Sequence, residues 1–148
     1  MHSLYTSTGQ VDFLQRIHRL SPESQPVWGK MTVSQMFAHC VVSLKIAFRE
    51  KPGYWTFWGF LFGSRARRKY VNSTKLFPKN LPTVFKQTGP KDFETEKAQL
   101  IEYVARFRTL GKESITTDKH PFFGDLSPEE WDYLTLKHLD HHFRQFGV

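Results

Sequence analysis

The fold is decided by one stretch near the end of the chain, SPEEWDYLTLKHLDHHFRQFG at residues 127–147. Ser127 and Pro128, followed by two acids, form a strong helix start. Serine caps the first amides, proline fits the first turn, and acids complement the helix dipole. Gly147 is a typical helix stop. The pattern therefore predicts a helix over about 128–146.

Two histidines lie on the apolar face of this predicted helix. At about 3.6 residues per turn, His138 and His142 point the same way, within a stripe that Trp131 and Leu134 mark as facing the core. Neutral imidazoles in such a stripe need polar partners, and a shared metal ion would satisfy one nitrogen of each. The spacing indicates a candidate metal site, for which the alternative is a pair of hydrogen-bonded core histidines.

Three earlier segments, at about 10–20, 33–49 and 92–110, have the periodicity of amphipathic helices. Thr32 and Gln35 form a capping box at the start of the second. The residues expected to face the core are Val11, Leu14, Ile17 and His18 in the first segment, and Phe93, Leu100, Ile101, Val104 and Phe107 in the third.

The chain between the second and third of these segments differs in composition. Residues 53–70 are aromatic and then basic, which favours a short extra helix, whereas 72–90 is rich in proline and polar residues and is expected to be a long surface connection. We therefore predict an all-α fold over a single domain, 1–148. The expected architecture is a four-helix bundle with a long crossover and a short extra helical segment.

Composition narrows the class of protein. Hydrophobic residues make up 39% and aromatic residues 16% of the 148 residues, which argues against disorder. The longest apolar run, at 53–63, is about half of what a membrane span needs, and the first eight residues do not resemble a secretory signal. The single cysteine, Cys40, fits a reducing compartment. A soluble cytoplasmic protein without a membrane span is expected.

The formal charge of +7 comes largely from residues 65–91, which contain eight lysines and arginines and no acid. A patch of this kind attracts anions. A solvated surface is the favoured interpretation, and contact with nucleic acid or an acidic partner is the alternative.

His39 is available as a third metal ligand. It lies in the middle of the second predicted helix, on a face that it shares with Gln35 and Ser43. If this helix neighbours the last one, three histidines could meet at one ion; the alternative is a hydrogen-bonded core histidine. Cys40 lies about 100° round the helix and is expected to be a small buried hydrophobe. His141 is expected at the rim of the site.

Four blocks of the chain resemble the DinB/YfiT-like superfamily, and within it an uncharacterised bacterial branch. They are WGKMTVSQMFAH at 28–39, HPFFG at 120–124, EW at 130–131 and HLDHHFRQFG at 138–147. The resemblance implies a four-helix bundle that binds a divalent metal, often nickel or zinc. The ligands would be one histidine on the second helix and an H-x-x-x-H pair on the last. The matching positions are His39, His138 and His142, with Gln145 at the family's trailing glutamine.

The resemblance also implies an activity class. Characterised relatives include transferases and isomerases that use low-molecular-weight thiols such as bacillithiol or mycothiol, and some are described as hydrolases. The leading hypothesis is therefore a divalent-metal-dependent enzyme that acts on a small molecule by thiol-dependent transfer or hydrolysis. Gln145 and His141 would orient the ligands, and His120, in the loop before the last helix, would transfer a proton or else serve as a turn residue.

Two other hypotheses remain open. One is a non-enzymatic, metal-containing binding protein that contacts nucleic acid or another polyanion through 65–91. The other is docking of the aromatic segment 54–62 on a second subunit, as in a homodimer, or on a membrane surface. The aromatic and basic segment 53–91 has no counterpart in the characterised branches of the superfamily, so their substrate is not transferred to this chain.

Overall fold

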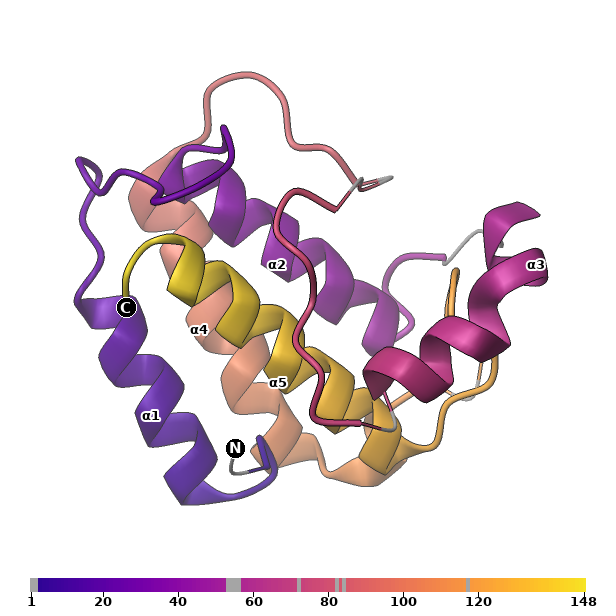
Figure 1. Ribbon diagram of the computed structural model, residues 1–148. Helices are drawn as coiled ribbons and strands as arrows, with labels where there is room; N and C mark the ends of the chain where they lie inside the picture. Colours follow the sequence, from indigo (N-terminus) through magenta and orange to yellow (C-terminus); the bar gives the residue numbers. More distant parts are fainter. Residues whose placement is uncertain (1–2, 53–56, 72, 82, 84, 117) are drawn as a thin grey trace.

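The computed structural model describes residues 3–52, 57–71, 73–81, 83, 85–116 and 118–148, which form five α-helices and no strand (Figure 1). The helices are α1 (Ser7–His18), α2 (Val33–Ala47), α3 (Phe57–Ala66), α4 (Phe93–Leu110) and α5 (Pro128–Gln145). A π-helical turn, η1 (Arg67–Val71), continues α3, and a 3₁₀ turn, η2 (Lys112–Ser114), follows α4. The predicted all-α class is confirmed. None of the described helices has both the length and the apolar character to cross a bilayer.

Local capping explains where the long helices begin. Thr32 with Gln35, and Ser127 with Glu130, form complete capping boxes in which each side chain bonds the other residue's backbone N–H. The predicted starts of α2 and α5 are therefore confirmed. Asp92, expected inside the third segment, is instead the N-cap of α4 and accepts the Thr95 N–H at 2.8 Å.

The core lies between α1, α2, α4 and α5. Helix α2 packs against both α4 and α5, and α1 packs against α4. The largest side chains that are fully buried are Phe37, Phe107, Phe143, Leu4, Ile17, Met36, Leu44, Leu100 and Leu139. Helices α2 and α5 lie side by side and run in opposite directions (Figure 1). This arrangement places the second half of α5 beside the first half of α2.

The predicted buried face of α1 is wrong in part. Ile17 is buried, but Val11 is 50% exposed, His18 is exposed, and the buried face is completed by Phe13 and Gln10. Gln10 is buried because its side-chain amide donates to the backbone carbonyls of residues 4 and 104 at 2.9 Å each. Two such bonds satisfy a buried amide, which rotates the helix away from the purely apolar stripe.

The connection from η1 to α4 passes across α5 on its way to the start of α4 (Figure 1). Lys137 of α5 holds the first part of this connection in place. Lys137, which is 2% exposed, donates from Nζ to the backbone carbonyls of Tyr70, Ser73 and Lys75 at 2.5–2.9 Å. Burial lowers the pKa of the Lys137 ammonium, and the three carbonyls compensate for its lost hydration. Farther along, Gln35 donates to the carbonyl of Gly89.

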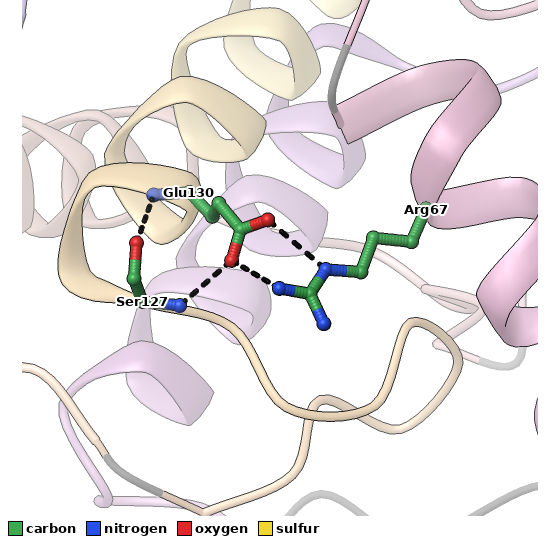
Figure 2. Close-up of polar contacts among 3 residues, drawn as sticks. All are labelled: Arg67, Ser127 and Glu130. Carbon is green, nitrogen blue, oxygen red and sulfur yellow. Dashed lines mark hydrogen bonds and ion pairs between the residues drawn. The ribbon is translucent and has the colours of Figure 1, made fainter.

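An ion pair joins η1, and with it α3, to the beginning of α5 (Figure 2). Arg67 donates to both carboxylate oxygens of Glu130, at 3.0 and 2.6 Å. The same carboxylate accepts the Ser127 N–H at 2.9 Å, so it caps α5 and holds η1 at once. The expected short helix in 53–70 is therefore present from Phe57; residues 53–56 lie outside the described residues.

Replacing Lys137 by methionine should lower the free energy of unfolding by about 2–3 kcal/mol, because three carbonyls lose their donor while the apolar stem is kept. Urea denaturation measures the change. Lys75→Met is the matched control, since its side chain is exposed and its carbonyl is unchanged. Equal stability of the two variants would contradict the anchoring role of Lys137.

Candidate metal centre

Three histidines from two helices meet between α2 and α5. His138 Nε2 lies 3.0 Å from His39 Nε2 and 3.2 Å from His142 Nε2. The three candidate ligand atoms all lie within 4.8 Å of one another. The residues named from the sequence as ligands are thus brought together at one point, and we call them the histidine triad.

The outer nitrogen of His39 has a partner that can only accept. His39 Nδ1 lies 3.2 Å from the backbone carbonyl of Phe85, in the connection between η1 and α4. A carbonyl has no proton to give, so Nδ1 carries the proton and donates it. In the neutral ring, Nε2 of His39 is therefore unprotonated.

The outer nitrogen of His142 is fixed in the same way by Gln145. His142 Nδ1 lies 2.9 Å from Gln145 Oε1, while Gln145 Nε2 donates to the backbone carbonyl of Trp28 at 2.8 Å. The Trp28 carbonyl requires the amide nitrogen on its side, so the amide oxygen faces His142 and accepts from Nδ1. Gly29, at φ +83°, leaves room for this amide, because a Cβ there would lie 2.5 Å from Gln145 Nε2.

His138 is oriented by a serine on the facing helix. His138 Nδ1 lies 3.1 Å from Ser43 Oγ, and Ser43 donates its own hydroxyl proton to the carbonyl of Cys40 at 2.7 Å. When the Ser43 hydroxyl donates to Cys40, its Oγ accepts from His138 Nδ1, and the lone pair of His138 Nε2 then faces the other two rings.

With the proton of each ring on Nδ1, the triad presents three nitrogen lone pairs to one another, and no ring can donate to the next. A cation between the three nitrogens would satisfy these lone pairs. Imidazole nitrogens bound to one ion at about 2.0–2.1 Å, with angles between octahedral and tetrahedral, lie about 2.9–3.4 Å apart. The two pairs that include His138, at 3.0 and 3.2 Å, fall in this range, and the third pair, His39 with His142, lies within 4.8 Å.

Electrostatics keep the triad neutral. Burial lowers the pKa of His39, and burial together with the neighbouring His39 lowers the pKa of His142 to about 3. The pKa of His138 lies well below its ordinary value through burial, with His142 and His39 adding to the effect. Neutral imidazole is the form that binds metal, so the site is prepared for an ion at neutral pH.

The residues expected beside the ligands take different places. Gln145 bonds His142 directly, as described above. The His141 ring packs edge-on against those of His142 and Trp28, at 5.1 and 5.9 Å between centroids, so it lies beside the triad and contributes no ligand atom to it. With Trp28 and Phe77 it lines a hollow of about 440 Å³.

His120 lies nearer the start of α5. Its Nδ1 accepts the backbone N–H groups of Phe122 and Phe123 at 3.0 and 3.1 Å, and its ring packs 5.0 Å from that of Trp131. The proton of the neutral ring is therefore on Nε2, the reverse of the triad. Burial lowers the pKa of His120 to about 3. In this state His120 donates a hydrogen bond from Nε2 and holds no acidic proton at neutral pH, so the structure does not favour the proton transfer expected of it.

Two contributors to the site were not assigned a role from the sequence. Ser43 was noted on the His39 face, and its task of orienting His138 emerges only when α2 faces α5. The Phe85 contact uses a backbone carbonyl, for which side-chain identity gives no signal. Cys40 is buried and contacts Met36, as expected of a small hydrophobe, and burial raises the pKa of its thiol.

Comparison with known proteins gives a family and no activity. Residues 3–147 match the model of a family described as "Protein of unknown function (DUF1569)". No curated protein and no solved structure matches the chain.

Nitrogen-detected NMR of the metal-free protein tests the tautomers. At pH 6.5, where an ordinary histidine is half protonated, His39, His138 and His142 should remain neutral with the proton on Nδ1 because burial lowers their pKa values. His120 should be neutral with the proton on Nε2, which provides an internal comparison. A proton on Nε2 in any ring of the triad would contradict the assignment.

Proposed function

The chain belongs to DUF1569, a family of proteins of unknown function, and we propose that it binds a divalent metal ion through His39, His138 and His142. The observation that carries the proposal is the convergence of three Nε2 atoms, each on a ring whose Nδ1 has a hydrogen-bond partner of its own. Such outer partners are typical of metal-binding histidines, because they fix the tautomer and the ring orientation.

We further propose that the fold is a four-helix bundle of the DinB/YfiT-like type, formed by α1, α2, α4 and α5. Support comes from the order of the ligands along the chain: one histidine on α2 and a pair four residues apart on α5, followed by Gln145. The placement of the triad between two facing helices agrees with how bundles hold metals. Helix α3 is then an addition to the bundle.

The donor set favours nickel or zinc. Imidazole nitrogens suit both ions, and three neutral ligands from the protein leave positions for water or a substrate. An ion held by three neutral ligands keeps its charge, so it would lower the pKa of a bound water or thiol or polarise a carbonyl.

A small-molecule reaction with a thiol, or a hydrolysis, is the activity that we propose for this site. The cluster that the described residues form contains no carboxylate, which leaves no obvious peptidase-like base and supports thiol-dependent transfer over hydrolysis. His120 would serve as a neutral hydrogen-bond donor through Nε2, since its Nδ1 is occupied by two backbone N–H groups.

The second candidate function is a non-enzymatic, metal-containing protein that contacts nucleic acid or another polyanion through 65–91. The observation in its favour is the run of cations without an acid, several of which, such as Arg68 and Lys86, are exposed. It predicts binding of an oligonucleotide that weakens steeply with salt.

Metal analysis of the purified protein tests the leading proposal. One nickel or zinc ion per chain is expected, and His138→Ala and His142→Ala should each weaken metal binding by more than about 100-fold, since loss of an outer partner alone costs 10–100-fold. Bound metal should also raise the free energy of unfolding by about 2.7 kcal/mol at a hundred times Kd. His141→Ala is the control, because His141 lies beside the triad without joining it. Equal, negligible metal in all four proteins would refute the proposal.

Two substitutions of Gln145 test whether this residue orients His142 or only supports the fold. Gln145→Leu removes the acceptor of His142 Nδ1 and should weaken metal binding by about 10–100-fold. Gln145→Glu keeps an oxygen at that place and should restore most of the affinity. Isothermal titration with zinc measures both. If the two variants bind zinc equally, Gln145 does not act through His142.

A further inference from the structure

Helix α3 is turned the opposite way from an ordinary surface helix. Its small residues Gly59 and Gly63 are buried, whereas Phe57 and Phe60 are each 70% exposed. A helix on a globular protein normally buries its large apolar residues against the core and exposes its polar ones. Phe57 and Phe60 therefore lie outside the buried core.

This orientation is held by specific contacts on the inner side. A Cβ at Gly63 would collide with the backbone carbonyl of Phe122, so only glycine allows α3 to lie this close to the turn before α5. On the next turn, the Arg67–Glu130 ion pair fastens η1 to the capped end of α5 (Figure 2). The outward direction of the phenylalanines is thus built into the fold.

The exposed apolar side chains are gathered on α3. Four of them lie within six residues: Phe57, Phe60, Leu61 and Phe62, with exposed fractions of 70%, 70%, 49% and 47%. We call these four residues the α3 apolar face. At 150–250 Å² for a whole aromatic side chain, these four residues together expose roughly 400 Å². This area is in the range of the largest apolar patch on a typical monomer, and such patches are often functional. The other large exposed hydrophobics are spread over α1, α4 and the connections.

Exposed cations follow this face in the sequence. Arg65, Arg68 and Lys69 follow it directly and are exposed, and no acid occurs between Glu50 and Asp92. Apolar aromatic residues beside arginine and lysine on a short helix are the composition of segments that lie in the interface of a membrane with anionic lipids.

We propose that α3 is a docking surface for an anionic lipid bilayer, with the α3 apolar face entering the interface and Arg65, Arg68 and Lys69 contacting the lipid phosphates. A second copy of the chain fits less well. Roughly 400 Å² is about half of what one partner contributes to a stable dimer, and two such faces would bring like charges together. Single-stranded nucleic acid fits less well too, since bases stack on rings along a groove, whereas these side chains project from a helix.

Co-sedimentation of the full chain with vesicles tests the proposal. Binding is expected to vesicles of phosphatidylcholine mixed with phosphatidylglycerol, and much weaker binding to phosphatidylcholine alone. The double variant Phe57→Ser/Phe60→Ser should lower the partition coefficient at least about tenfold through lost apolar burial. Arg65→Ser/Arg68→Ser should lower it by a similar factor at low salt and should flatten its salt dependence.

Matched controls carry the same number of changes away from α3. Val27→Ser/Leu110→Ser removes two exposed apolar side chains, and Arg19→Ser/Lys30→Ser removes two exposed cations. Both should partition like the original chain. Circular dichroism and metal content should be equal in all variants, because none of the substituted residues contacts the histidine triad.

Four outcomes would overturn the proposal. One is no sedimentation with either vesicle, and another is equal binding to both lipid compositions. A third is an effect of the controls as large as that of the α3 variants. The fourth is a concentration-dependent dimer, or binding of a single-stranded oligonucleotide, that the α3 variants abolish while vesicle binding is absent.

Discussion

The packing of α2 against α5 brings the Nε2 atoms of three imidazoles together, at 3.0 and 3.2 Å for the two pairs that include His138. Several other parts of the molecule hold the three rings in this arrangement. Lone pairs do not attract one another, and the rings stay in place because each Nδ1 donates to a fixed acceptor. Because these acceptors are a backbone carbonyl, a serine and a glutamine, the site depends on three separate parts of the chain.

The irregular segments are therefore as important to the site as the helices. Phe85 lies in the connection that Lys137 and Gln35 fasten to the surface of α5 and α2. Trp28 lies in the linker before α2, and its carbonyl orients Gln145. A surface loop normally tolerates insertions, but a loop whose backbone carbonyl sets a histidine tautomer cannot move without disturbing that ring.

Features of the fold and the site that depend on neighbouring residues were predictable from the sequence. Features that depend on contacts between distant parts of the chain were harder to predict. The starts of α2 and α5 follow from Thr32 and Ser127, because a capping box acts within four residues. The His138–His142 pair follows from helical spacing alone. Including His39 in the site requires knowing that α2 and α5 are neighbours. The family resemblance suggested this, because it implied one ligand on the second helix and two on the last. The burial of Gln10 and the outward phenylalanines of α3 depend on partners far along the chain, namely the carbonyl of Val104 and the turn at Phe122.

Helix α5 connects the two proposed activities through its register. Consecutive residues serve opposite tasks, since His138 faces α2 while Lys137 faces the connection that carries Phe85. The capping box of Ser127 and Glu130 fixes where the helix begins, and burial of its apolar stripe fixes which residues face the core. The carboxylate of Glu130 also holds Arg67 and thereby α3 (Figure 2). One side chain thus sets the position of the aromatic helix and helps to set the start of the helix that presents two of the three metal ligands. The α3 apolar face and the histidine triad are therefore both positioned by α5, although no residue belongs to both.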